Sequence, residues 1–184
     1  MFIQTESTPN PATLKFLPGR AVMETGTAYF AAASESARSP LAESLFAVPG
    51  VEGVFLGADF VTITKTEERD WSLLKPAILG VIMEHFTADK PVVLGGEAES
   101  EESFEAADAE IVGQIKELLE TRVRPAVAQD GGDIVFRGFD KGIVYLHMQG
   151  SCAGCPSSTA TLKMGIENML KHYVPEVIEV RPVV

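Results

Sequence analysis

Both cysteines of the 184-residue chain fall in one short motif, residues 150–156 with the sequence GSCAGCP. Thiolates three positions apart in a tight turn can point at the same small volume. Cys152 and Cys155 could therefore bind one soft metal ion, hold one edge of an iron–sulfur cluster, or form a disulfide. Because Pro156 suits the first position of a helix, we expect Cys155 at a helix N-terminus, where the pKa values of both thiols would be lowered.

The number of available ligands limits what this motif can hold. One CxxC supplies two thiolates, whereas a structural zinc site or a cluster usually has four ligands. We expect none of the three histidines to complete the set: His85 lies far away in the sequence, His147 on a strand and His172 in the last turn of a helix. The simplest completion is a second copy of the chain across a twofold axis. The count therefore predicts a site shared between two subunits, exposed and easily dismantled, as a carrier requires.

Other patterns of catalytic residues are weak. The chain has no P-loop, GxGxxG, GxSxG or HExxH motif. We interpret residues 130–133, DGGD, as a turn rather than a carboxylate pair, with glycine supplying a positive φ. The hydroxyls of residues 157–159, SST, are expected to satisfy backbone N–H groups in the first turn of a helix. The sequence favours a binding protein over an enzyme.

The elements around the cysteines follow from apolar spacing. A stripe that begins at Ile111 predicts a helix, which Pro125 ends or bends. Residues 134–138 and 142–149 predict a hairpin, and a second helix follows Pro156 before a last strand over 177–180. One face of the hairpin should hold Val144, Leu146 and Met148, and the inner face of the second helix Leu162, Ile166, Met169, Leu170 and Tyr173.

The first half of the chain also mixes strands and helices. Residues 12–17 and 27–31 predict short strands, and residues 51–56 and 60–65 a hairpin. Ser39-Pro40 predicts a helix start that Gly50 ends. Asp70 should cap a further helix with Trp71, Leu74, Ile78 and Val81 inside, in which Pro76 could produce a kink.

The charge of the chain is unevenly distributed. The net charge is −11, and residues 91–110 carry seven acidic and no basic side chains. A Gly-, Ser- and Glu-rich segment with so few apolar residues cannot offset its ordering entropy, so we expect a flexible acidic linker. The acidic balance disfavours nucleic-acid binding. No apolar run is long enough to span a membrane, no targeting peptide is evident, and two cysteines suit a reducing compartment.

These patterns predict an α+β fold: two small α/β-type domains joined by the linker. We expect an N-terminal domain over residues 1–90, the linker over 91–107 and a C-terminal cysteine-containing domain over 108–184.

The motifs resemble a known family. Residues 130–133 (DGGD), 150–158 (GSCAGCPSS), 162–163 (LK) and 174–177 (VPEV) resemble the C-terminal domain of NifU-like iron–sulfur scaffold proteins. The first half resembles the N-terminal domain of the Nfu branch through TPNP at 8–11, LKF at 14–16, ARSPLA at 37–42, DFVTITK at 59–65 and Trp71. The resemblance covers nearly the whole chain except the acidic linker.

The resemblance implies a scaffold or carrier that is not an enzyme. Cys152 and Cys155 would bind a labile 4Fe–4S cluster, bridged in a homodimer, received from the upstream assembly machinery and passed to apo client enzymes. The N-terminal domain, which has no cysteine, would dock a partner. Because no import peptide is evident, we expect a bacterial-type cytoplasmic protein, or one of the mitochondrial matrix if processed. Two alternatives remain open: a CxxC thiol–disulfide oxidoreductase, and an interaction protein with a structural zinc.

Overall fold

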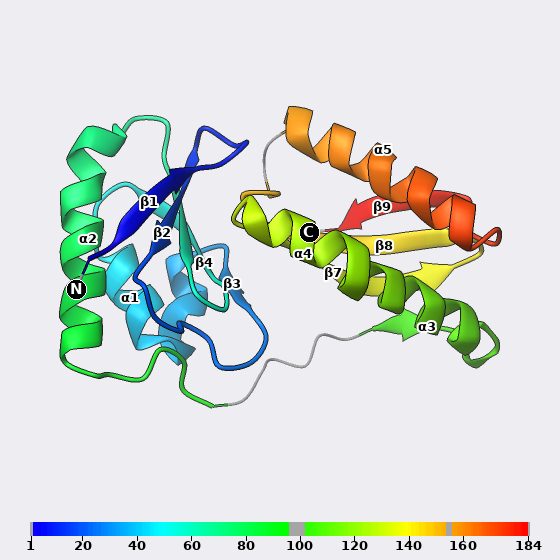
Figure 1. Cartoon of the computed structure of the whole chain (residues 1–184), viewed down its shortest axis with the longest axis horizontal. Helices are drawn as coiled ribbons and strands as arrows, with labels where there is room; N and C mark the ends of the chain where they lie inside the picture. Colours follow the sequence, from blue (N-terminus) through cyan, green and yellow to red (C-terminus); the bar gives the residue numbers. More distant parts are fainter. Residues whose placement is uncertain (1, 96–101, 154–155, 184) are drawn as a thin grey trace. The chain divides into compact units, whose positions relative to one another are not determined.

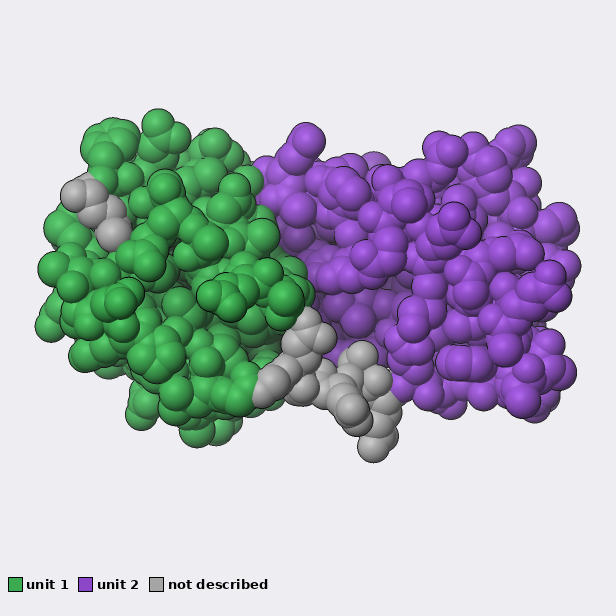
Figure 2. Space-filling model, turned by 60° about the horizontal axis from the view of Figure 1, so that its bottom comes forward, with its two compact units in different colours: residues 1–98 green, residues 99–184 purple. Residues whose placement is uncertain are grey.

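The chain forms two compact units, residues 1–98 and 99–184 (Figure 2). The computed structural model describes residues 2–95, 102–153 and 156–183, without the side chains of 156–159. Each unit has a sheet with its own apolar core, so the predicted α+β class with two domains is confirmed.

The sheet of the first unit is antiparallel throughout, with the strand order β1-β2-β5-β4-β3. Its strands are β1 (Gln4–Ser7), β2 (Thr13–Leu17), β3 (Ala28–Phe30), β4 (Val51–Leu56) and β5 (Val61–Lys65). The sequence predicts all of them except β1. That strand is exposed along its whole length at the edge of the sheet, so it lacks the apolar alternation by which a strand is recognised.

Two α-helices pack on this sheet (Figure 1): α1 (Pro40–Phe46) and α2 (Trp71–Thr87). A short 3-10 turn, η1 (Ala33–Arg38), precedes α1. As predicted, the Ser39 hydroxyl accepts from the Ala42 amide at 3.0 Å, and the Asp70 carboxylate caps α2 by accepting from the Ser72 amide at 3.4 Å. The helix α2 continues through Pro76, which is exposed.

The sheet of the second unit has the order β6-β7-β8-β9. Its strands are β6 (Ser103–Phe104), β7 (Gly132–Asp140), β8 (Ile143–Gly150) and β9 (Glu179–Val183). The hairpin β7–β8 is antiparallel, while β6 pairs with β7 and β9 with β8 in parallel. Val144, Leu146 and Met148 are buried together, as predicted. The two-residue β6 was not predicted, and β9 begins two residues later than expected.

The helices of the second unit lie on one face of this sheet (Figure 1): α3 (Ala109–Leu118), α4 (Arg124–Gln129) and α5 (Pro156–Tyr173). A 3-10 turn, η2 (Ala106–Asp108), leads into α3, and a π-helical turn, η3 (Leu119–Val123), joins it to α4. This wider turn brings Pro125 to the start of α4, where no amide N–H is needed. Pro125 therefore does not end the helical segment.

One predicted core position is wrong. Tyr173 keeps 47% of its surface exposed, and the Arg122 guanidinium lies over its ring at 4.9 Å from the centroid. A residue in the last turn of a helix can lie on the predicted inner face of the helix and still extend beyond the end of the sheet. Among the described residues, no helix is long and apolar enough to cross a membrane.

Candidate functional site

The motif with the cysteines begins in a tight loop at the end of β8. Gly150 has a φ of +63° and Gly131 a φ of +81°, a region that favours glycine. The Ser151 hydroxyl donates to the Asp130 carbonyl oxygen at 2.6 Å, and the Ser151 amide donates to the Gly131 carbonyl oxygen at 3.2 Å. These bonds hold the loop that carries Cys152 against the DGGD segment.

Gly132 lies directly beneath the sulfur of Cys152. A Cβ built on Gly132 would stand 2.6 Å from Cys152 Sγ and 3.0 Å from the Gln149 carbonyl oxygen. Gly132 belongs to β7, so it is needed for clearance rather than for a positive φ. The prediction of a turn in which glycine supplies a positive φ is confirmed at Gly131.

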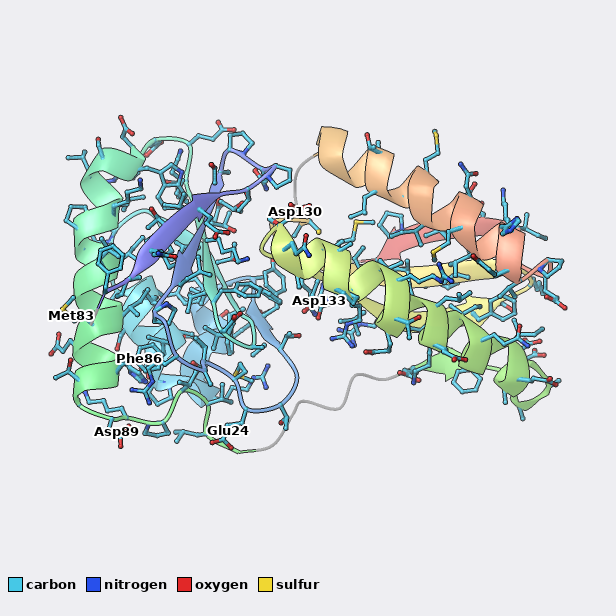
Figure 3. All side chains as sticks on the ribbon, in the orientation of Figure 1. Glu24, Met83, Phe86, Asp89, Asp130 and Asp133 are labelled. Carbon is cyan, nitrogen blue, oxygen red and sulfur yellow. The ribbon has the colours of Figure 1, made fainter. Side chains whose placement is uncertain are left out.

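An ion pair between a buried carboxylate and a half-buried guanidinium anchors the DGGD segment. Asp133 is 3% exposed, and its carboxylate accepts from Arg124 Nε and Nη2, both at 2.8 Å. The Ile134 amide also donates to Asp133 Oδ1, and Arg124 contacts Glu120 as well. Figure 3 shows Asp130 and Asp133 where α4 gives way to β7. Since the partners come from α4 and β7, the pair fixes the strand that supports the cysteine loop.

The structure corrects the expected acidity of Cys152. The side chain is 6% exposed, and burial raises the pKa of the thiol to about 11. The negative charges of Asp130 and Asp133 raise this pKa further, while a hydrogen bond with Ser151 lowers it. The prediction of a lowered pKa is therefore wrong for Cys152, because loss of solvation outweighs the local hydrogen bond.

The second cysteine lies outside the described residues. Cys155 precedes Pro156, where α5 begins, which agrees with the expected helix start. Its predicted position at the helix N-terminus and the predicted lowering of its pKa stay predictions. The hydroxyls of residues 157–159 belong to the side chains that are not described.

The three histidines are dispersed. His147 faces the side of the sheet opposite the helices, and its Nδ1 lies 3.2 Å from Arg137 Nη2 and 3.1 Å from Gln149 Nε2. His172 is exposed in the last turn of α5, and His85 is buried in the first unit. Within the described part of the chain, no group of three or more His, Cys, Asp or Glu side chains could hold a metal ion.

The sequence analysis missed the residues that support the loop. Arg124 and Asp133 are nine positions apart on different elements, and no local pattern pairs them. The DGGD segment did offer one indication in the sequence. Two adjacent glycines between carboxylates indicate a stretch of backbone beside which there is little room for a side chain. The segment could not show that the room is taken by Cys152, 20 residues further along.

Two family models match the chain. The N-terminal domain of the scaffold protein Nfu/NifU matches residues 3–89, and the NifU-like domain matches residues 115–181. Together they span both units, and the second includes both cysteines.

The chain is also similar to individual relatives and to a solved structure. The chain is 54% identical over 182 residues to the mitochondrial NFU1 iron-sulfur cluster scaffold homolog of Homo sapiens, covering 96% of this chain and 70% of that protein. It is 53% identical over 181 residues to the mitochondrial NifU-like protein 5 of Arabidopsis thaliana, covering 96% and 66%. The solution structure of a NifU-like protein from Saccharomyces cerevisiae is 29% identical, with a TM-score of 0.46 over 50% of this chain and 84% of that one.

The chain spans roughly two thirds of the length of these curated relatives. The matches cover both units, and the match to the NifU-like domain includes the DGGD segment and the cysteine loop. The chain therefore belongs to the Nfu/NifU family of scaffold proteins.

Proposed function

We propose that the protein is an iron–sulfur cluster scaffold and carrier, rather than an enzyme. Cys152 and Cys155 from two copies would hold one labile 4Fe–4S cluster, which is the cargo. The assembly machinery would supply the cluster, and apo client proteins would receive it. The printed names of the relatives, which call those proteins cluster scaffolds or NifU-like, support this role.

The observation that carries the proposal is the shortage of ligands. Among the described residues, Cys152 belongs to no group of three or more side chains that could hold a metal ion, and the whole chain has two cysteines. A cluster held by four thiolates then needs a second copy. Burial of the Cys152 sulfur on Gly132 supports a site that is held ready for ligation. Binding requires the thiol to lose its proton, which the positive charge of the iron favours.

We assign the roles of the parts on the same grounds. Residues 1–90, which have no cysteine, would dock a partner; residues 91–107 would be the acidic linker; and residues 108–184 would bind the cluster. The relatives' names place those proteins in mitochondria, which supports the matrix, a reducing compartment in which disulfides are disfavoured.

Anaerobic reconstitution with iron and sulfide tests the proposal. We expect about four iron and four sulfide per two chains, in a species with the mass of a dimer. The variants Cys152→Ser and Cys155→Ser should each lose the cluster. The matched control His147→Ala should keep the cluster, because we do not expect His147 to bind iron.

Other outcomes would overturn the proposal. A loaded monomer, without a small-thiol ligand, would contradict the bridged site. A ratio of about two iron per dimer would show that the site binds a 2Fe–2S cluster instead of a 4Fe–4S cluster. A reversible disulfide between Cys152 and Cys155, with turnover of a disulfide substrate and no cluster, would favour the oxidoreductase. Zinc that stays bound to the protein in the presence of iron and sulfide would favour the interaction protein with a structural zinc site.

A further inference from the structure

Asp130 is an exposed acidic residue whose carboxylate does not help to hold the fold. It follows α4 directly, as the C-cap of that helix. Among the described residues, its carboxylate has neither a hydrogen bond nor an ion pair. A negative charge at the C-terminal end of a helix opposes the helix dipole, so the charge of Asp130 does not stabilise α4. The fold therefore gives no reason for an acidic residue at this position.

The backbone holds Asp130 beside the cysteine loop. The Asp130 carbonyl oxygen accepts from the hydroxyl of Ser151, the residue before Cys152, at 2.6 Å. Two residues after Asp130, Gly132 lies so close to Cys152 that a Cβ there would stand 2.6 Å from the sulfur. The charge of Asp130 reaches that sulfur, because it contributes to the raised pKa of the Cys152 thiol. Asp130 therefore lies within electrostatic range of the proposed cluster site.

The charge of Asp130 is not balanced by a paired cation. Asp133, the other carboxylate that acts on Cys152, accepts two bonds of 2.8 Å from Arg124. Arg124 also pairs with Glu120, so one guanidinium serves two carboxylates. Asp130 pairs with no cation in the described part of the chain. The segment next to the cysteine loop thus has a net negative charge, and Asp130 is its unpaired member.

This negative charge would repel the cargo. A cluster held by four cysteine thiolates is itself anionic, because the thiolate charges outweigh the positive charge of the iron–sulfur core. A nearby carboxylate repels such a cluster, but solvent and salt weaken the repulsion at an exposed site. Asp130 would therefore lower the affinity for the cluster without preventing it from binding.

We propose that Asp130 sets how readily the cluster leaves, by repelling it from the site. The inference rests on the proposed carrier function and assigns a residue to the release step. In transfer, each bond from iron to a carrier cysteine breaks as a bond from that iron to a client cysteine forms. The proton lost by the client thiol balances the proton taken up by the freed carrier thiolate, and no electron moves.

A charge series at Asp130 tests the inference in the full chain, reconstituted with iron and sulfide. The probe is bipyridine, an uncharged chelator of ferrous iron, and the decay of the cluster absorbance gives the rate of loss. Asp130→Asn should lose the cluster several-fold more slowly than the wild type, and Asp130→Lys more slowly still. Asp130→Glu, which keeps the charge, should behave as the wild type does.

Asp140→Asn is the matched control. Asp140 is also exposed, and it ends the strand β7 that Gly132 begins. The length of the strand places Asp140 about 26 Å from Gly132, well beyond the screening length at physiological salt. The loss of this charge should leave the rate of cluster loss unchanged.

Two further measurements distinguish charge from structure. Raising the salt concentration should bring the loss rates of the wild type and Asp130→Asn together, because salt screens an exposed charge. The reduction potential of the cluster should be more positive in Asp130→Asn, since reduction adds negative charge beside the carboxylate. A purely structural role for Asp130 would not make the difference between the rates depend on salt.

Each contrary result overturns the inference. Equal rates for the wild type, Asp130→Asn and Asp130→Lys would exclude an effect of charge, and slow loss from Asp130→Glu would assign the effect to side-chain shape. Slow loss from Asp140→Asn would assign it to the net charge of the chain. A wild-type chain that takes up no cluster would overturn the proposed function itself, and this inference with it.

Discussion

Each unit buries an ionisable side chain, and the two are treated in opposite ways. In the second unit, Asp133 is paired with Arg124 through two bonds of 2.8 Å. In the first unit, His85 is 3% exposed, and neither ring nitrogen has a hydrogen-bond partner among the described residues. Burial therefore favours the neutral form of His85, whereas the burial of Asp133 is compensated by the adjacent guanidinium of Arg124.

This contrast shows where the fold fixes the relative orientation of its elements. A charged pair joins α4 to β7 beneath the cysteine loop and fixes the orientation of both elements. A neutral histidine packed against Phe86 contributes shape but little direction. The unit proposed to bind the cluster joins a helix to a strand through two short charged bonds, whereas the buried Lys15 of the first unit lies 3.7 Å from Glu6 on the neighbouring strand.

Breaking the ion pair should have the largest effect. Arg124→Ala leaves the Asp133 carboxylate buried without its partner, which should lower the free energy of unfolding of the second unit by about 3 kcal/mol. Urea unfolding followed by circular dichroism measures this loss. Trp71, the single tryptophan of the chain, reports on the first unit, so its fluorescence transition should not move.

A rescue variant separates charge from packing. Arg124→Met combined with Asp133→Leu should recover most of the lost stability, because an apolar pair removes the unpaired charge. If Arg124→Ala unfolds at the wild-type urea concentration, the pair does not contribute to stability and the contrast between the units fails.

Filling the space beneath the sulfur should have the next largest effect. Gly132→Ala places a methyl group 2.6 Å from Cys152 Sγ, so the cysteine loop must shift, at a cost of about 1–2 kcal/mol. Cluster yield on reconstitution should fall with it. Gly165→Ala on α5 is the control, since a Cβ there meets nothing within 4 Å and should stabilise the helix. An unchanged cluster yield in Gly132→Ala would contradict the supporting role of Gly132.

The pH dependence of the first unit should follow His85. Burial lowers the pKa of His85, and the positive charges of Lys90 and Arg20 lower it further, while the nearby backbone of Lys90 and Pro91, which does not reach hydrogen-bond geometry with the ring, partly offsets this. Histidine in the unfolded chain has a pKa of about 6.5. Below that pH the unfolded state binds more protons, so His85 lowers the stability of the unit as the pH falls through the unfolded value.

Urea unfolding followed by Trp71 fluorescence at several pH values measures this dependence. His85→Leu should remove part of the loss in acid, because leucine cannot be protonated. His172→Leu is the control, as His172 is exposed on α5 in the other unit. Equal acid sensitivity of His85→Leu and the wild type would exclude His85 as a source.

The smallest effect expected is at a helix cap. Asp70→Ala removes the 3.4 Å bond to the Ser72 amide and should destabilise the first unit by about 0.5 kcal/mol. The fluorescence transition of Trp71, which adjoins the cap, should shift slightly, and the circular dichroism of the second unit should not. A shift as large as that of Arg124→Ala would show that the first unit depends on this contact far more than its exposure suggests.

Local sequence determined much of the protein. Ser39 and Asp70 start helices because a side-chain oxygen caps free amides within three residues, and Pro156 begins α5 because its ring fits the first helical position. The alternation of Val144, Leu146 and Met148 gave the buried face of β8. The cysteine spacing, the ligand count and the family resemblance also came from the sequence alone.

Tertiary structure decided what depends on segments that are distant in the chain. The burial of Cys152 and its raised pKa follow from the packing of its loop on Gly132 and the nearby carboxylates. The pairing of Arg124 with Asp133 depends on how the helical segment bends through its π turn. Capping and alternation are set by neighbours in sequence, whereas solvation and ion pairing are set by whichever surfaces the fold brings together.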